Sequence, residues 1–124
     1  MSYYVYIAAP YTNPDPVENT HTAVRMADSL RELGFIPFCP HLSLLWHMVC
    51  PHEPDYWYEY DLEWLLQCDV LLRLPGDSYG ADREVEFALE HDIPVLRTVD
   101  ALLGWAQLRN GCAVEREPPD GPDD

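Results

Sequence analysis

Four short apolar stretches, separated by longer segments with helical spacing, constrain the fold of this chain more than any other feature. The stretches are YYVYIAAP, FIPFCP, DVLLRLP and IPVLRT. The first is rich in β-branched and aromatic residues, and DVLLRLP is apolar almost throughout, which is typical of a central strand in a parallel sheet. The pattern therefore predicts strands over residues 3–8, 35–40, 69–75 and 93–98.

The segments between these stretches predict helices. Asp15 is an expected N-cap, since Pro16 takes the first helical position and Glu18 follows the cap by three residues. Gly34 is the expected end of that helix, because glycine readily adopts the conformation that terminates helices. The remaining helices are expected as a short one within residues 41–57, then a longer one from about Asp55, then 81–91 and 99–110.

Strands that alternate with helices in this way predict an α/β protein. We expect a three-layer Rossmann-like (flavodoxin-like) sandwich whose mostly parallel sheet has four to five strands. The length of 124 residues suits a single domain. We assign it to residues 1–110 and expect 111–124, which are acidic and proline-rich, to be a disordered tail.

The charge balance excludes several classes of function. The chain has 22 acidic and 7 basic residues and a formal net charge of -15, so it repels nucleic-acid backbones and anionic membrane surfaces. We therefore expect a small-molecule partner, and neither a nucleic-acid polymer nor a membrane. All basic residues are arginine, which excludes Schiff-base chemistry and a phosphate-binding Walker lysine.

The cysteines and histidines favour a cytoplasmic protein without a metal. The four cysteines are widely spaced, and the chain opens directly into a strand-like segment without a leader pattern, so we expect reduced thiols and a cytoplasmic location. His41, His47 and His52 lie close in sequence but lack a convincing carboxylate or cysteine partner, so a metal site is not expected. We expect no cofactor.

Ligands of parallel α/β sheets bind at the carboxyl ends of the strands. That rule selects three loops, at residues 8–13, 40–46 and 75–80. In them we expect Ala8, Pro10, Tyr11 and Gly80 to contact a substrate. None of the loops contains a GxGxxG or GxxxxGK[ST] motif, and the chain has no GxSxG motif.

Two carboxyl groups fit the needs of glycosyl transfer. Cleavage of an N-glycosidic bond passes through an oxocarbenium-like state that a carboxylate can stabilise or trap, while a second acid protonates the departing base. Glu84 is expected in the first turn of a helix, whose dipole would keep it ionised, and Asp61 can supply the proton. Composition and spacing alone favour the ordinary alternative, in which Glu84 is a surface residue and Asp61 is solvated.

Three motifs, taken in their order along the chain, favour the catalytic interpretation over this ordinary alternative. VYIAAPYT, DLEWLLQCDVLL and GADREVEFALEHDIPV occur in this order and at suitable distances between about Tyr4 and Val95. Together they resemble the nucleoside 2-deoxyribosyltransferase family and its nucleoside 5'-monophosphate N-glycosidase relatives. The resemblance implies cleavage or transfer at the N-glycosidic bond of a 2'-deoxyribonucleoside or its 5'-monophosphate.

The resemblance also implies roles for individual residues. The family nucleophile falls on Glu84, with Glu86 in the place of a family glycine, where it either crowds the sugar or points away. Tyr6 matches the tyrosine that orients the nucleophile, and Asp61 matches the aspartate near the base. In the relatives, a residue at the position of Ser78 contacts the 5' end of the sugar. The histidine of the monophosphate-hydrolysing relatives falls on His41.

The motifs leave open the 5' end of the substrate, the type of reaction, the oligomeric state and a non-catalytic alternative. Ser78 favours a nucleotide, whereas the lack of an arginine in the first loop favours a neutral nucleoside, and either transfer or hydrolysis is compatible with the motifs. The resemblance implies a homodimer or a higher homo-oligomer, in keeping with an apolar last helix at residues 99–110. The alternative function, favoured by Glu86, is a non-catalytic nucleoside- or nucleotide-binding protein on the same scaffold.

Overall fold

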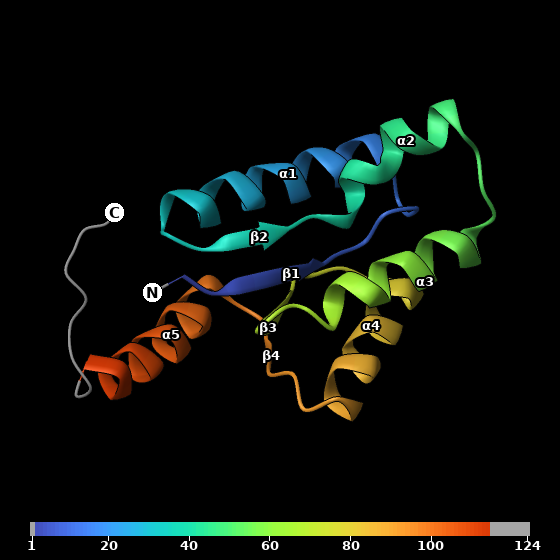
Figure 1. The fold of residues 1–124 in the computed structure, drawn as a ribbon. Coiled ribbons are helices and arrows are strands. Elements are labelled where there is room, and N and C mark those ends of the chain that lie inside the picture. Colours follow the sequence, from blue (N-terminus) through green and yellow to red (C-terminus); the bar gives the residue numbers. More distant parts are fainter. Residues whose placement is uncertain (1, 115–124) are drawn as a thin grey trace.

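The computed structural model describes residues 2–114, with the side chains of 111–114 excepted. Strands and helices alternate along the chain, as expected (Figure 1). The strands are β1 (Tyr4–Ala8), β2 (Ile36–Phe38), β3 (Val70–Arg73) and β4 (Val95–Leu96). The helices are α1 (Pro16–Glu32), the 3-10 helix η1 (Pro40–Ser43), α2 (Leu44–Val49), α3 (Pro54–Leu65), α4 (Tyr79–Glu90) and α5 (Val99–Val114).

The four strands form one sheet in the order β2-β1-β3-β4, and every pair is parallel. Tyr6 of β1 lies opposite Phe38 on one side and Leu71 on the other. The chain leaves β1 towards β2 and then crosses back to β3, so the strand order reverses between β1 and β3. The expected α/β sandwich with a parallel sheet is confirmed, with four strands.

Helices cover both faces of the sheet and divide the core into two parts. Helices α1 and α5 bury Ala23, Leu30, Leu102 and Ala106 against one face. Helices α3 and α4 lie side by side on the other (Figure 1), where they bury Leu65, Ala81, Val85 and Ala88. The arrangement is the three-layer sandwich that the sequence predicts.

Alternation along β1 determines which of its side chains face helices α3 and α4. Val5 and Ile7 pack in the part of the core under α1 and α5. Tyr6 and Ala8 pack in the part under α3 and α4, because successive side chains of a strand point to opposite faces. Tyr6 is therefore directed towards the helix that carries Glu84.

The predicted beginning and end of α1 are confirmed. The carboxylate of Asp15 accepts a 2.9 Å hydrogen bond from the backbone N–H of Glu18, and Pro16 is the first helical residue. Gly34, directly after the cap residue Leu33, has a φ of +100°, a conformation that side chains disfavour. Local chemistry thus limits α1 at both ends.

Other boundaries differ from those expected. Helix α4 begins at Tyr79 rather than Ala81, because the side chain of Ser78 caps it. Helix α5 extends to Val114, beyond the expected end at Asn110, and its Leu102 and Ala106 are covered by the protein's own sheet. The expected tail from 111 thus begins within a helix, and its residues 115–124 lie outside the described residues.

Within residues 2–114, no helix combines the length and the apolar character that crossing a membrane requires.

Candidate active site

A cavity of about 650 Å³ lies where the loop after β1, the segment after β2, and helices α3 and α4 meet. This is the carboxyl end of the sheet, beside the reversal of strand order between β1 and β3, where open α/β sheets hold their ligands. Its volume suits a small organic molecule. Of the nine predicted site residues, six line it: Tyr11, His41, Asp61, Ser78, Gly80 and Glu84.

Glu84 and Tyr6 form the shortest contact between side chains at this cavity. The hydroxyl of Tyr6 donates a 2.7 Å hydrogen bond to Oε2 of Glu84, and both side chains are buried. Oε1 of Glu84 has no hydrogen-bond partner among the described residues and is not a fully buried atom. Tyr6 therefore holds one carboxylate oxygen and leaves the other available to a molecule in the cavity.

Burial, rather than the helix dipole, dominates the acidity of Glu84. Its pKa is raised to about 7, chiefly because the side chain is removed from water. The hydrogen bond from Tyr6 and the charges of Arg73 and Arg83 lower it only in part. The prediction of a first-turn residue was wrong, since α4 begins two residues earlier and Glu84 is its sixth residue. The effect of the dipole is confined to the first turn.

Tyr6 itself stays protonated. Burial raises the pKa of its phenol well above the ordinary value, and the negative charges of Glu84 and Asp61 raise it further. A protonated phenol is a hydrogen-bond donor, so Tyr6 orients the carboxylate of Glu84 without competing with it for a proton.

Asp61 is the second buried carboxyl group of the cavity. It lies on α3, is 8 % exposed, and has an oxygen, Oδ1, that is buried without a partner. Burial, with a smaller contribution from the charge of Glu84, raises its pKa to about 8. The alternative of a solvated helix position is therefore wrong. Near neutral pH, Asp61 carries a proton beside the more acidic Glu84.

His41 joins two of the predicted loops. Its Nε2 lies 2.7 Å from the carbonyl oxygen of Pro10, and its ring meets the ring of Tyr11 edge-on. Because a carbonyl oxygen only accepts, Nε2 is the protonated nitrogen. Burial lowers the pKa of His41, which favours the neutral ring. The side chain therefore links the segment after β2 to the loop after β1 and lines the cavity without a positive charge.

Tyr6, Ala8 and Pro10 lie outside the cavity lining. Ala8 is fully buried under α4, and Ile7 and Ala9, its neighbours on the strand, line the cavity instead. Pro10 contributes its carbonyl oxygen to His41. These three residues contact residues that line the cavity but do not line it themselves.

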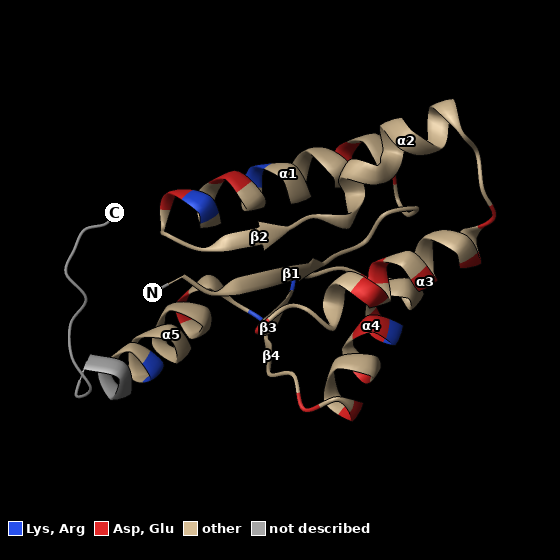
Figure 2. Ribbon diagram, viewed as in Figure 1, with Lys and Arg blue, Asp and Glu red and all other residues tan. Residues whose placement is uncertain are grey.

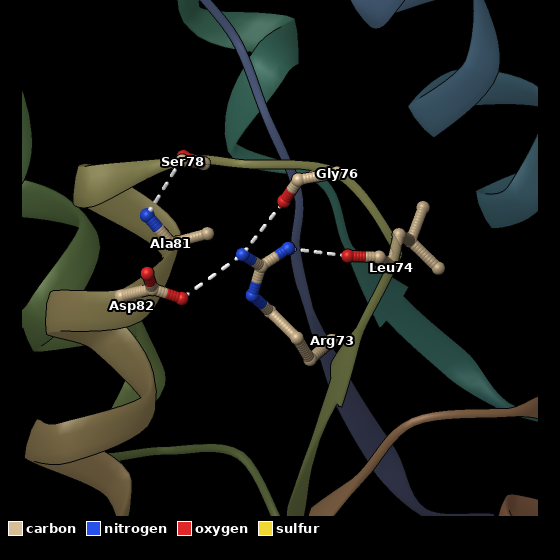
Figure 3. Close-up of polar contacts among 6 residues, drawn as sticks. All are labelled: Arg73, Leu74, Gly76, Ser78, Ala81 and Asp82. Atoms are coloured by element: carbon tan, nitrogen blue, oxygen red, sulfur yellow. Dashed lines mark hydrogen bonds and ion pairs between the residues drawn. The ribbon is translucent and has the colours of Figure 1, made fainter.

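The loop from Leu74 to Ser78 is fixed by a buried arginine that sequence reasoning missed. Figure 3 shows Arg73 directing its guanidinium to the carbonyl oxygens of Leu74 and Gly76 and to the carboxylate of Asp82. The contacts with Gly76 and Asp82 are both 2.9 Å long. At the end of the loop, Oγ of Ser78 accepts a 3.0 Å hydrogen bond from the N–H of Ala81. Arg73 thereby holds the loop against the start of α4.

Gly76 allows this loop to approach the loop after β1. Its φ is +118°, and a Cβ at this position would lie 2.8 Å from Cγ of Pro10. Any side chain would therefore both strain the backbone and push the two loops apart.

A wall of aromatic and histidine residues on α2 and α3 completes the cavity. It includes His47 on α2, Trp57 and Tyr58 on α3, and His52 in the loop between these helices. The guanidinium of Arg83 lies 3.8 Å from the centre of the Tyr58 ring. The density of aromatic residues between 46 and 64 was the available signal, but it did not indicate which rings face the cavity. Arg83 was visible within the third motif and was given no role.

Residues 3–98 match the family described as Domain of unknown function (DUF7768). The chain belongs to this family. No curated protein and no solved structure matches it. The DUF7768 match runs from β1 to the residue before α5 and therefore includes every residue that lines the cavity. The cavity therefore lies within the DUF7768 domain of this chain.

The DUF7768 cavity holds several carboxyl groups and few cations. Asp55, Asp61, Asp77 and Glu84 line it, against a single arginine, Arg83. Acidic residues recur along α3 and α4 (Figure 2). Among the described residues, no group of three or more histidine, cysteine, aspartate or glutamate side chains is arranged to hold a metal ion. The side chains that line the cavity include carboxyl groups, phenols, histidine rings, an indole and the guanidinium of Arg83.

Proposed function

We propose that this DUF7768 protein cleaves or transfers at the N-glycosidic bond of a 2'-deoxyribonucleoside or its 5'-monophosphate, with Glu84 as the nucleophile. The observation that carries the proposal is the buried pair of carboxyl groups, Glu84 and Asp61, at one cavity. Their pKa values are about 7 and about 8. One group thus ionises before the other, as a nucleophile and a general acid require.

The first step follows from these protonation states. A lone pair of Glu84 Oε1 forms a bond to the anomeric carbon, and the bond from that carbon to the base nitrogen breaks. The electron pair stays with the base, which takes the proton of Asp61. Tyr6 keeps its hydrogen bond to Oε2 and so fixes the direction of attack.

The second step regenerates both groups. Water or a second base attacks the anomeric carbon, the bond to Glu84 breaks, and Asp61 takes up the proton that the attacking group releases. Attack by water gives hydrolysis, and attack by a base gives transfer. The volume of about 650 Å³ leaves room for a nucleoside.

The experiment measures free base by HPLC after incubation with 2'-deoxyribonucleosides and their 5'-monophosphates, with and without an acceptor base. Base release without an acceptor indicates hydrolysis, and a new nucleoside formed only with an acceptor indicates transfer. Comparison of nucleosides with 5'-monophosphates shows whether the substrate carries a 5'-phosphate. Ser78 favours a phosphate, whereas the carboxyl groups of the cavity disfavour one. No base release from any substrate would overturn the proposal.

The alternative, a nucleoside- or nucleotide-binding protein without activity, relied on Glu86. This side chain is exposed and is not among the residues that line the cavity, so it does not occupy the place of a sugar. Glu86 therefore gives the alternative no support. Tight nucleoside binding by calorimetry, together with no base release, would select it. The homo-oligomer implied by the resemblance remains a prediction, which light scattering tests.

A further inference from the structure

His47 is the centre of a small hydrogen-bond network at the aromatic wall of the cavity. Its Nδ1 lies 2.8 Å from Nε1 of Trp57 and 3.2 Å from the backbone nitrogen of His52. The contacts join α2, the loop that follows it, and α3. All three residues line the cavity.

These contacts determine the tautomer of His47. An indole N–H and a backbone N–H can only donate, so Nδ1 accepts both hydrogen bonds and cannot carry a proton itself. The proton of the neutral ring is therefore on Nε2.

The N–H at Nε2 is uncommitted within the part of the chain that the structure describes. No hydrogen bond to Nε2 is present there, and the atom is not among the fully buried polar atoms without a partner. Two other ring N–H groups of the cavity are already engaged. That of His41 meets the carbonyl oxygen of Pro10, and that of Trp57 meets His47. His47, which lines the cavity, thus carries a donor whose orientation is fixed by the contacts of Nδ1.

We propose that His47 is a specificity residue that donates its Nε2 proton to a carbonyl oxygen of the bound nucleobase. This inference rests on the proposed function. A carbonyl oxygen is an acceptor without charge, which suits a neutral N–H in a cavity lined by several carboxyl groups. A phosphate is a poorer fit, because a neutral ring supplies no positive charge and Asp55 and Asp77 add exposed negative charge to the cavity.

Two substitutions separate the two nitrogens of His47. In His47→Asn the amide oxygen can still accept from Trp57, but nothing remains at the position of Nε2. In His47→Gln the longer side chain can place an N–H near the position of Nε2 and gives up the contact with Trp57. His21→Asn is the matched control, since His21 is exposed on α1 and does not line the cavity.

Binding is measured by calorimetry in the Glu84→Gln background, so that the nucleoside is not consumed. The nucleosides form pairs that differ by one carbonyl group, namely 2'-deoxyinosine with purine 2'-deoxyriboside, and 2'-deoxyuridine with 2'-deoxyzebularine. For one pair, we expect His47→Asn to weaken binding of the member with the additional carbonyl group about 3- to 10-fold and to leave binding of the other member unchanged. His47→Gln retains more of the preference than His47→Asn, and His21→Asn retains all of it.

Equal effects on both members of each pair would overturn the assignment, as would a loss confined to the 5'-monophosphates. A long-range ¹H–¹⁵N spectrum gives an independent reading, in which the proton of His47 appears on Nε2, and a proton on Nδ1 would also contradict the proposal. Failure of this inference is distinguishable from failure of the proposed function. If wild type releases base and His47→Asn keeps the wild-type preference among nucleosides, only the role of His47 is wrong. If wild type neither releases base nor binds nucleosides, both the role of His47 and the proposed function are wrong.

Discussion

The hydroxyl of Tyr6, on the first strand, holds Oε2 of Glu84, on the fourth α-helix, through a 2.7 Å hydrogen bond between two buried side chains. The two residues are 78 positions apart, and the packing of α4 against β1 brings them together. This hydrogen bond orients the carboxylate of Glu84 at the cavity.

Removal of the Tyr6 hydroxyl tests this contact. Tyr6→Phe keeps the buried ring and should cost about 1 kcal/mol of stability, while base release falls about 10-fold or more. Because the hydrogen bond lowers the pKa of Glu84, its loss moves the acidic limb of the activity profile to higher pH. Steady-state kinetics between pH 5 and 10 measure both effects. Tyr4→Phe is the control on the same strand, since Tyr4 is half exposed and should leave the profile unchanged.

The pH dependence of activity follows from the two carboxyl groups. Glu84 must be ionised to attack, so activity rises as pH passes its pKa of about 7. Asp61 must be protonated to donate, so activity falls as pH passes its pKa of about 8. We expect a narrow bell with its maximum between these values. Asp61→Asn should lower activity most for poor leaving bases and remove the alkaline limb, and a wild-type profile that is flat from pH 5 to 10 would contradict the assignment.

Asp61 also makes stability depend on pH in a defined direction. Its pKa is about 8 in the folded protein against an ordinary value of 3.8. Between these two pH values, the folded state binds a proton that the unfolded chain has released. Stability contributed by the protonated form is therefore lost as pH rises towards and through 8. Each unit of pKa shift corresponds to about 1.4 kcal/mol.

Asp61→Asn should accordingly raise the free energy of unfolding at pH 9, relative to wild type, and the difference should shrink towards pH 5. Urea denaturation at the two pH values measures it. Glu63→Gln, an exposed position on the same helix, should change stability little at either pH. If Asp61→Asn were less stable than wild type at pH 9, the prediction would be wrong, because other groups of the folded protein would then stabilise the buried carboxylate.

Arg73 should contribute to stability through the loop that precedes α4. Arg73→Met removes the contacts with Leu74, Gly76 and Asp82 and should cost on the order of 2–4 kcal/mol. It also removes a positive charge that lowers the pKa of Glu84, so the acidic limb of activity moves to higher pH. Arg97→Met is the matched control, since Arg97 is exposed. Equal denaturation midpoints for the two variants would remove the role of Arg73 as an anchor.

The sequence predicted those features that depend on local chemistry. Asp15, Pro16 and Gly34 mark the limits of α1 through capping and backbone preferences that act within a few residues. The apolar character of DVLLRLP correctly indicated a central strand, since β3 lies between β1 and β4. The rule that ligands gather at the carboxyl ends of strands placed three loops near one cavity, and all three contribute to its lining.

Features that depend on long-range packing were missed. The burial of Asp61 is set by the packing of α3 against α4, and nothing in DLEWLLQCD distinguishes it from the exposed Glu63 of the same helix. Arg73 ends an apolar strand and resembles a surface residue, yet it is buried among partners in the following loop and at the start of α4. The sequence does not reveal the path of that loop. Position at the end of the strand selected Ala8, but its side chain is buried in the core against residues of α4 and does not reach the cavity.

The most direct test of the central claim measures free base by HPLC with wild type, Glu84→Gln and Glu86→Gln. Glu84→Gln should lower base release by more than about 1000-fold, because an amide is a poor nucleophile, with an unchanged far-UV spectrum. Glu86→Gln, two residues along the same helix but exposed and outside the cavity, should release base at the wild-type rate. Wild-type turnover in Glu84→Gln would contradict the account.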